Sequence, residues 1–268
     1  MAKMKNLNNK LFDLSNYNIL VTGATGHLGA QICYSLADNG ANVLVNGRNK
    51  IKVENIVKKI TKRKLKAESI IFDVTNKKEI KNSLKKIKYL NVIINNAYKG
   101  NPGSIKNSQD ADYFSAFEVG LMGAVNVFNE SFSLLKIGSK KFGDASVINI
   151  SSMYSIITPD LKIYKSLKHS NPPYYGLVKS ALNSWTKYGA LEFGKIPIRF
   201  NSISPGPFPK QEFINNNKIT VKKIISKSAL NRIASPIELS GSIIYLSSKA
   251  SSYVTGSNLI VDGGYSIT

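Results

Sequence analysis

The sequence is poor in several residue types that mark particular classes of protein. It has one cysteine, one tryptophan and two histidines among 268 residues. The lone cysteine, Cys33, excludes an intramolecular disulfide and any cysteine-based metal site, and we expect no metal. Cys33 lies with Leu28, Ile32 and Leu36 in a helical pattern of apolar residues. This pattern favours a small core residue over a reactive thiol.

Long hydrophobic runs are also missing. No stretch approaches the roughly 18 consecutive apolar residues that indicate a membrane-spanning helix. Residues 1–16 are polar and rich in Asn and Lys, without the apolar region of a signal peptide. The sequence therefore predicts a polar N-terminal extension, no export, no membrane association and a cytoplasmic location.

Acidic residues are few, since 16 Asp and Glu stand against 37 Lys and Arg, which gives a formal net charge of +21. Clustered cations could bind nucleic-acid phosphates. However, only four of the basic residues are arginines, and the lysines are spread over the expected helix surfaces. Because Arg is the usual reader of phosphates and bases, we expect no nucleic-acid partner. The excess positive charge suits an anionic small-molecule substrate.

What the sequence does contain begins with a glycine-rich turn. The apolar run 19–21 leads into the segment 22–29, with glycine at positions 23, 26 and 29, and a helical pattern follows. This spacing allows a tight turn, close approach of the backbone to a pyrophosphate and close helix packing. The N-terminus of the following helix would attract the anion. A purely structural turn is the alternative, but the position between a strand and a helix favours dinucleotide binding.

The second apolar run, 42–46, ends at Gly47 and Arg48. An NAD-binding protein usually has a carboxylate here for the adenosine ribose hydroxyls, whereas a 2′-phosphate requires a cation and no carboxylate. Gly47 and Arg48 therefore predict that NADP(H) is preferred, with NAD(H) left open. The alternative is that Arg48 only caps the lysine-rich helix expected over 50–64.

Strands and helices continue to alternate along the chain. This alternation predicts right-handed crossovers and a parallel sheet. No repeat or linker divides the 268 residues, so one domain is expected. We therefore predict a single-domain α/β protein with a doubly wound, Rossmann-type fold, in which helices flank seven parallel strands. The expected strands are 19–21, 42–46, 69–72, 91–94, 146–150, 198–204 and 258–261.

Tyr175 and Lys179 lie four residues apart in a helical pattern, so both side chains can point into one cavity. A free tyrosine ionises near pH ~10, and an adjacent ammonium would lower its pKa toward the range useful for proton transfer. Ser152 closely follows the expected strand 146–150, which brings a hydroxyl to the sheet edge where ligands bind. A solvated Lys beside a half-buried Tyr is the alternative interpretation of the Tyr–Lys spacing.

Together these motifs resemble the short-chain dehydrogenase/reductase family over nearly the whole chain from about residue 17. Further matching motifs are Asn-Asn-Ala at 95–97 and Asp-Gly-Gly at 262–264. The resemblance implies that Tyr175 is the general acid/base, that Ser152 orients the substrate oxygen, and that Lys179 holds the nicotinamide ribose while lowering the Tyr175 pKa. The cofactor-binding residues that it implies are Thr22, Gly23, Thr25, Gly26, His27, Leu28, Gly29, Arg48, Asp73, Val74, Asn96, Ala97, Tyr175, Lys179, Pro205 and Gly206.

The sequence also departs from the family's pattern. The family's shorter-chain members usually have glycine where His27 and Tyr98 stand, and a catalytic asparagine in the place of Gly120. We expect the space beside Gly120 to admit a water held by backbone carbonyls, so that a proton relay persists without the amide. Asn126 cannot substitute, because six residues of helix place it on another face.

The loop before Tyr175 is longer than is typical of the family. Its sequence resembles sugar-acid dehydrogenases and oxidoreductases of flagellin-modification and surface-glycan pathways. Tyr164 and His169 in the segment 159–173 could contact substrate or simply face solvent. The segment 207–232 is expected to form a substrate lid, because its first part is polar and aperiodic. The candidate substrate-binding residues are Met153, Tyr154, Tyr164, Pro207 and Phe208.

The segment 113–135 is apolar around most of its helical circumference. Such a helix is buried on more than one side, which predicts self-association as a homotetramer or dimer. The hypothesis is an NADP(H)-dependent oxidoreductase that transfers a hydride between nicotinamide and a carbonyl or secondary alcohol, on a sugar or nucleotide-linked sugar. The alternative is a dinucleotide-sensing binding protein that has lost turnover, suggested by Gly120. The presence of Ser152, Tyr175 and Lys179 argues against this alternative.

Overall fold

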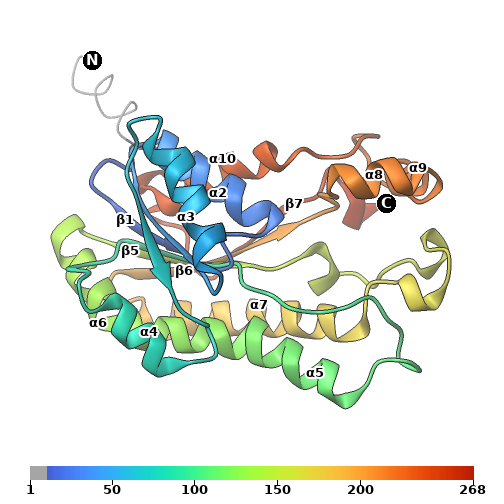
Figure 1. Ribbon diagram of the computed structural model, residues 1–268, viewed down its shortest axis with the longest axis horizontal. Coiled ribbons are helices and arrows are strands. Elements are labelled where there is room, and N and C mark those ends of the chain that lie inside the picture. The colour runs from blue at the N-terminus through green and yellow to red at the C-terminus, as the bar shows by residue number, and fades with distance from the viewer. Residues whose placement is uncertain (1–10) are drawn as a thin grey trace.

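A computed structural model describes residues 11–268, which form one seven-stranded sheet between two layers of helices (Figure 1). The strand order is β3-β2-β1-β4-β5-β6-β7, and every neighbouring pair is parallel. The predicted doubly wound fold is confirmed. The strands are β1 (Asn18–Val21), β2 (Asn42–Gly47), β3 (Ala67–Ile71), β4 (Val92–Asn95), β5 (Ala145–Ile150), β6 (Ile198–Pro205) and β7 (Asn258–Val261).

The helices cover both faces of the sheet. In Figure 1, α2 (His27–Asp38), α3 (Lys50–Thr61) and α10 (Ser240–Ser247) lie on one side. The other side carries α4 (Lys77–Leu84), α5 (Asp110–Phe117), α6 (Gly123–Phe142) and α7 (Pro173–Phe193). Two short helices, α8 (Gln211–Asn216) and α9 (Lys218–Ser226), follow β6. Within residues 11–268, no helix is long and apolar enough to cross a membrane.

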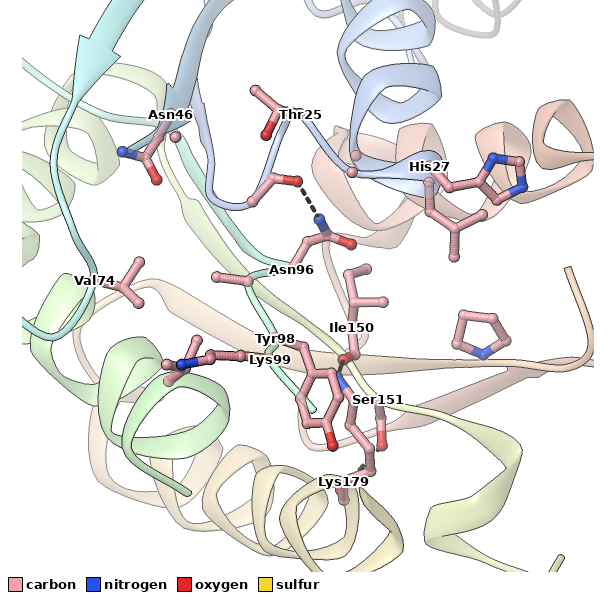
Figure 2. A pocket seen from close by; sticks show the side chains of 18 of the residues that line it. Thr25, His27, Asn46, Val74, Asn96, Tyr98, Lys99, Ile150, Ser151 and Lys179 are labelled. Atoms are coloured by element: carbon pink, nitrogen blue, oxygen red, sulfur yellow. Dashed lines mark hydrogen bonds between the residues drawn. The ribbon is translucent and has the colours of Figure 1, made fainter. Parts of the chain in front are cut away.

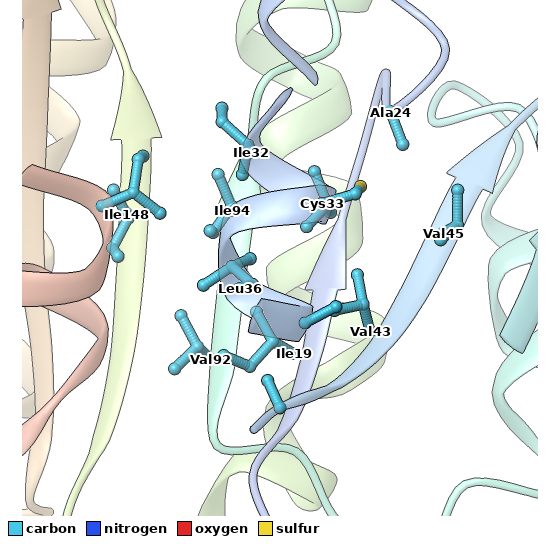
Figure 3. Close-up of a cluster of buried hydrophobic side chains, with 14 of the residues drawn as sticks. Ile19, Ala24, Ile32, Cys33, Leu36, Val43, Val45, Val92, Ile94 and Ile148 are labelled. Carbon is cyan, nitrogen blue, oxygen red and sulfur yellow. The ribbon is translucent and has the colours of Figure 1, made fainter. Parts of the chain in front are cut away.

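The core is divided by the sheet, because successive strand residues point to opposite faces. In β1, Ile19 and Val21 pack beneath α2, whereas Leu20 packs on the other face. Cys33 is fully buried in the first of these clusters, as predicted (Figure 3). Burial raises the pKa of its thiol, so Cys33 behaves as a small apolar side chain.

Part of the predicted N-terminal extension is packed into the core. Residues 1–10 lie outside the described part of the chain. Leu14 is fully buried in the same cluster as Ile19, and its amide donates to the Asn39 carbonyl at 3.1 Å.

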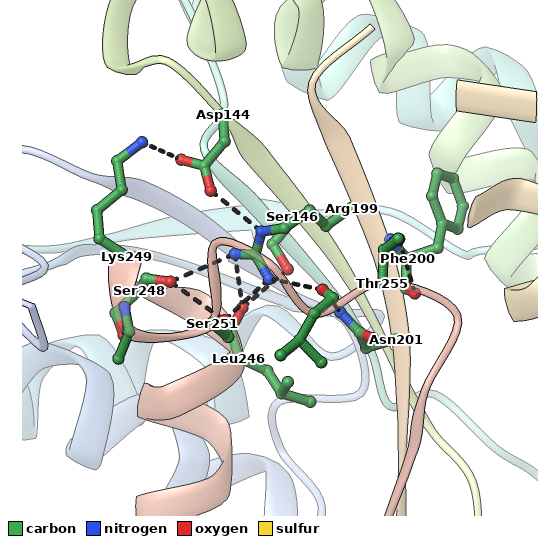
Figure 4. Close-up of polar contacts among 12 residues, drawn as sticks. Asp144, Ser146, Arg199, Phe200, Asn201, Leu246, Ser248, Lys249, Ser251 and Thr255 are labelled. Atoms are coloured by element: carbon green, nitrogen blue, oxygen red, sulfur yellow. Dashed lines mark hydrogen bonds and ion pairs between the residues drawn. The ribbon is translucent and has the colours of Figure 1, made fainter. Parts of the chain in front are cut away.

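A buried ionic cluster joins β6 to the segment that precedes β7 (Figure 4). The Arg199 guanidinium donates to the Asp144 carboxylate at 3.1 Å, to the Ser251 hydroxyl at 2.9 Å and to the Leu246 carbonyl at 3.1 Å. Lys249 also pairs with Asp144. Because the buried guanidinium has both a counter-charge and neutral acceptors, its desolvation is offset. The cluster fixes the C-terminal strand against the rest of the sheet.

Residues 110–142 form a continuous helical segment with an irregular middle. A π-helical turn spans Glu118–Met122, between α5 and α6. Such turns are rare and occur often at functional sites. Gly120 lies at the centre of this turn and is buried.

Candidate functional site

The glycine-rich turn adopts the close-packed geometry that its spacing predicts. Gly23 has φ +59°, a conformation that favours glycine. A Cβ atom on Gly29 would lie 2.4 Å from the Gly23 carbonyl oxygen, so a side chain there would not fit. The helix α2 begins after Gly26, which provides no side-chain cap. The first amides of α2 are therefore available to an anion.

Nearly all the predicted cofactor residues line one hollow, which we call the first cavity (Figure 2). Its volume is about 490 Å³. It lies along the ends of the central strands, where ligands bind in open α/β sheets. The predicted residues that line it are Gly23, Thr25, Gly26, His27, Leu28, Gly29, Arg48, Asp73, Val74, Asn96, Ala97, Tyr175, Lys179, Pro205 and Gly206.

Thr22 is the exception, and its prediction as a cofactor-binding residue is not supported by its position. It is 1% exposed and does not line the first cavity. Its hydroxyl accepts hydrogen bonds from the amides of Asn96 at 3.0 Å and Ala97 at 3.2 Å, and donates to the Ile94 carbonyl. Thr22 therefore fixes the segment after β4, because it faces that neighbouring strand rather than the cavity.

Arg48 and Asp73 meet at one end of the first cavity. The Arg48 guanidinium lies 3.4 Å from the Asp73 carboxylate, and its side chain is 67% exposed. Partial burial would raise the pKa of Asp73, but hydrogen bonds from Thr75 and the charge of Arg48 outweigh burial and lower it. Asp73 therefore remains charged at neutral pH, while the exposed face of Arg48 is free to meet a further anion.

His27 connects the glycine-rich turn to the segment that leads into α8. Burial and the charge of Lys210 lower the pKa of its imidazole, and hydrogen bonds to the backbone of Phe208 and Pro209 partly oppose this shift. Phe208 lines the first cavity as well. The imidazole thus lies where the family usually has no side chain, beside the start of the predicted lid.

Tyr175 and Lys179 lie on α7, which begins with Pro173 in its first turn, a favourable position for proline. The Lys179 ammonium is 3% exposed and donates to the Ile150 carbonyl at 2.6 Å. The Ser151 hydroxyl donates to the Lys179 carbonyl at 3.0 Å, which joins α7 to the end of β5. These contacts bring the predicted Tyr–Lys pair to the sheet edge, as the spacing suggested.

The expected lowering of the Tyr175 pKa by Lys179 is wrong for this structure. Burial raises the pKa of the Tyr175 phenol, and a hydrogen bond with the Ser152 side chain only partly opposes this effect. Burial also lowers the pKa of Lys179, to about 8. The ammonium lies 5.7 Å from the centre of the Tyr175 ring and is bonded to Ile150. At neutral pH the phenol is protonated and therefore able to donate a proton.

A second cavity, of about 600 Å³, adjoins the first. All the predicted substrate residues line it, namely Met153, Tyr154, Tyr164, Pro207 and Phe208. Ser152 also lines it, whereas His169 lines neither cavity and bonds to the Ser166 hydroxyl. Tyr175 lines both cavities, so its phenol stands where molecules bound in the two cavities would meet.

Several lining residues were missed by sequence reasoning. Tyr98 and Lys99 line the first cavity, directly after the Asn-Asn-Ala motif that ends β4. Their position in the chain was a signal that could have been used. Asn171 and Tyr265 line the second cavity. Nothing local marks these two residues, since they come from a long loop and from the chain beyond β7.

The expected water-filled space beside Gly120 is also wrong. A Cβ atom on Gly120 would lie 2.6 Å from Cγ1 of Val178 and 3.2 Å from Cδ2 of Tyr98. These two side chains fill the space, so no room remains for a water. Asn126 is directed elsewhere, because its amide donates to the Val74 carbonyl at 3.2 Å.

The chain is similar to known proteins over nearly its whole length. A family model described as enoyl-(acyl carrier protein) reductase matches residues 23–266. A 7alpha-hydroxysteroid dehydrogenase from Paraclostridium sordellii is 30% identical over 260 residues, covering 95% of this chain and 93% of that protein. Gluconate 5-dehydrogenase from Gluconobacter oxydans is 27% identical over 267 residues, covering 96% of this chain and 98% of that protein. The crystal structure of a candidate gluconate dehydrogenase from Agrobacterium tumefaciens has a TM-score of 0.86 at 26% identity, covering 97% of this chain and 99% of its own.

Proposed function

This chain belongs to the short-chain dehydrogenase/reductase family, and on that premise we propose that it is an NADP(H)-dependent oxidoreductase interconverting a carbonyl group and a secondary alcohol. The single observation that carries the proposal is the position of Tyr175. Its phenol lines both cavities, with the Ser152 side chain within hydrogen-bonding reach and Lys179 one helical turn away. Both relatives named above are dehydrogenases by name.

The first cavity has features that fit a dinucleotide. Gly23, Gly26 and Gly29 keep its floor free of side chains, and the uncapped start of α2 would hold a pyrophosphate. When bound, the nicotinamide supplies or accepts the hydride.

The chain's own residues would handle the proton. In the reductive direction, the carbonyl oxygen receives a hydrogen bond from the Ser152 hydroxyl and the proton from the Tyr175 phenol. The carbonyl carbon gains the hydride, so the C=O bond becomes CH–OH and the phenol is left as phenolate. In the oxidative direction the phenolate takes the alcohol proton. The Lys179 ammonium lies one turn away on α7, where it donates to the Ile150 carbonyl and lines the first cavity beside Tyr175.

The preference for NADP(H) is supported by the end of β2. Gly47 offers no carboxylate against a 2′-phosphate, and the exposed face of the Arg48 guanidinium borders the first cavity. An arginine–phosphate pair is charge-assisted and can be bidentate. Asp73 competes for the same guanidinium at 3.4 Å, but it engages only NH1 and leaves the rest of the fork for the phosphate.

A sugar or nucleotide-linked sugar is the substrate class that we propose. Hydroxyl and amide groups of Tyr164, Asn171 and Asn217 line the second cavity beside the rings of Phe208 and Tyr154. Hydroxyls and amides can bond to the several hydroxyls of a sugar, and the rings can cover its apolar face. The name gluconate 5-dehydrogenase of one relative points the same way. Lys210 at the rim of the cavity would favour an anionic sugar.

The segment 207–232 is proposed as the lid of the substrate site. Its residues Glu212 and Phe213 from α8 and Ile224 from α9 line the second cavity. A lid of this kind would exclude water during the reaction.

The test is consumption of NADPH against a panel of ketoses, keto-sugar acids and nucleotide-linked keto-sugars. We expect turnover with at least one member of the panel and saturable NADPH binding. Binding of NADPH with no turnover on any carbonyl compound would support the dinucleotide-sensing alternative. Absence of NADPH and NADH binding would refute both.

A further inference from the structure

We propose that Tyr98 is a positioning residue for the proposed acid/base pair: its ring holds the Tyr175 phenol and the Lys179 ammonium in place, and Gly120 and Gly100 provide the space for that ring. The inference rests on the proposed function, in which Tyr175 transfers the proton. It assigns a role to two positions, 98 and 120, that set this chain apart from the family's pattern.

The base of the Tyr98 side chain is held firmly. Tyr98 follows Asn96 and Ala97, whose amides both donate to the Thr22 hydroxyl. The Asn96 side chain also donates to the Gly23 carbonyl at 3.0 Å. The backbone directly before Tyr98 is therefore fixed to the end of β1 and to the glycine-rich turn. The Tyr98 ring can thus act as a rigid wall of the first cavity.

The ring of Tyr98 contacts Tyr175 edge to face. The two ring centres lie 4.9 Å apart with an angle of 82° between the planes. Tyr154 packs on Tyr175 in a similar way, at 6.4 Å and 80°. Edge-to-face pairs at such distances attract beyond simple burial. Tyr98 supplies the shorter of these two ring contacts to the proposed proton donor.

The same ring also faces the Lys179 ammonium. The Nζ atom lies 5.3 Å from the Tyr98 ring centre, within the range of a cation–π interaction. Figure 2 shows the Lys179 side chain running beside this ring to the Ile150 carbonyl. Among the described residues Lys179 forms no salt bridge. The partners of the buried charge among the described residues are therefore the Ile150 carbonyl and two aromatic rings, of which the Tyr98 ring is nearer than the Tyr175 ring, at 5.3 Å against 5.7 Å.

Two glycines leave the space that the Tyr98 side chain occupies. A Cβ atom on Gly120 would lie 3.2 Å from Cδ2 of Tyr98 and 2.6 Å from Cγ1 of Val178. A Cβ atom on Gly100 would lie 2.4 Å from the Tyr98 hydroxyl oxygen. A side chain at either position would therefore crowd the Tyr98 side chain, directly from Gly100 and together with Val178 from Gly120. In the π-helical turn, the Cα of Gly120 lies so close to Val178 and Tyr98 that no side chain larger than hydrogen fits there.

The ring, rather than the hydroxyl, makes the contacts that matter. The Tyr98 hydroxyl is buried and has no hydrogen-bond partner among residues 11–268. Burial raises the pKa of this phenol, so it stays protonated and neutral. The contacts to Tyr175 and Lys179 both involve the aromatic ring. Phenylalanine at position 98 should therefore preserve the function of the residue, and leucine should not.

The test compares Tyr98→Leu, Tyr98→Phe and Gly120→Ala by kcat, by the NADPH Kd and by thermal unfolding. Because a small misplacement of catalytic groups can cost up to about a hundredfold in rate, we expect Tyr98→Leu and Gly120→Ala to lower kcat by about tenfold to a hundredfold. Tyr98, Tyr175 and Lys179 all line the first cavity, so the NADPH Kd is measured for each variant and kcat is compared at saturating NADPH. Tyr98→Phe should recover most of the kcat that Tyr98→Leu loses.

Matched controls come from positions outside the site. Tyr253 is fully exposed, and a Cβ atom on Gly241 would meet nothing within 4 Å. Tyr253→Leu and Gly241→Ala should therefore leave kcat unchanged. A wild-type kcat in Tyr98→Leu would overturn the proposal. An equal loss of kcat in Tyr98→Phe and Tyr98→Leu would also overturn the proposal, because the hydroxyl and not the ring would then be the group that matters.

Failure of the proposed function is detected separately. If wild type shows no turnover, or if Tyr175→Phe is as active as wild type, the proposed oxidoreductase function is refuted. The positioning role of Tyr98 can still be tested in that case. Crystal structures of wild type and Gly120→Ala decide it without turnover. We expect the added methyl group to displace the Tyr98 ring and to move Lys179 off the Ile150 carbonyl. An unchanged arrangement of Tyr98, Tyr175 and Lys179 would refute the proposal.

Discussion

Replacing Lys179 with Met should change how the stability of the protein depends on pH. The substitution keeps an unbranched side chain of similar length but removes a buried ammonium. Burial holds the pKa of Lys179 at about 8 in the folded protein, against ~10.4 in an unfolded chain. Between these two values the unfolded chain binds more protons than the folded one. The free energy of unfolding of wild type therefore rises with pH in this window, and the contribution is lost as pH falls through about 8.

The size of this effect follows from the two pKa values. Integrating the difference in bound protons from pH ~7 to ~9.5 gives about 2 kcal/mol of added stability in wild type from this one group. Lys179→Met has no such group and lacks this contribution. All other titrating groups are common to both proteins, so they cancel when the two pH dependences are subtracted.

Urea unfolding at several pH values between about 7 and 9.5 measures the effect. The free energy of unfolding of wild type minus that of Lys179→Met should increase by about 2 kcal/mol across this range. Lys187→Met is the matched control, because Lys187 is an exposed lysine on the same helix, α7. Its difference from wild type should stay constant. If the difference in free energy of unfolding between wild type and Lys179→Met is also constant with pH, Lys179 is not a buried ammonium with a lowered pKa, and the account given above is wrong.

Cofactor choice, assembly and core stability can each be tested with one variant. Gly47→Asp would place a carboxylate beside Arg48. Fluorescence titration should then show that NADPH affinity falls by about tenfold to a hundredfold and that NADH is preferred. An unchanged preference would contradict the proposed 2′-phosphate site. Light scattering of wild type should give a molar mass that is a multiple of 29.4 kDa. Leu191→Lys, at a position 86% exposed on α7, should lower that molar mass. A wild-type monomer at micromolar concentration would refute self-association. Asp144→Ala should lower the free energy of unfolding by about 3–5 kcal/mol, because it leaves the buried Arg199 charge without its counter-ion, and a loss below about 1 kcal/mol would argue against that pairing.

The sheet and most of the site could be predicted because they depend on local patterns. Alternating strands and helices leave few possible topologies, and the strand ends then bring Asp73, Asn96 and Ser152 to one edge. The four-residue spacing of Tyr175 and Lys179 is likewise a property of any helix. These predictions required no knowledge of which distant residues would touch.

The features that could not be predicted depend on contacts between distant segments. The direction of Thr22 depends on its pairing with β4, which sequence alone does not specify. The space beside Gly120 is filled by Val178 and Tyr98, which lie 58 and 22 positions away in the chain. The raised pKa of Tyr175 reflects burial, which a Tyr–Lys spacing does not reveal.

The central claim is that Tyr175 transfers the proton in a hydride-transfer reaction. The most direct test measures kcat and the NADPH Kd of wild type and Tyr175→Phe on the substrate found by the carbonyl panel. The substitution removes one hydroxyl and little volume, so kcat should fall by ~10²- to 10⁴-fold while the Kd stays nearly unchanged. A variant that keeps more than about a tenth of the wild-type kcat would contradict the role given to Tyr175.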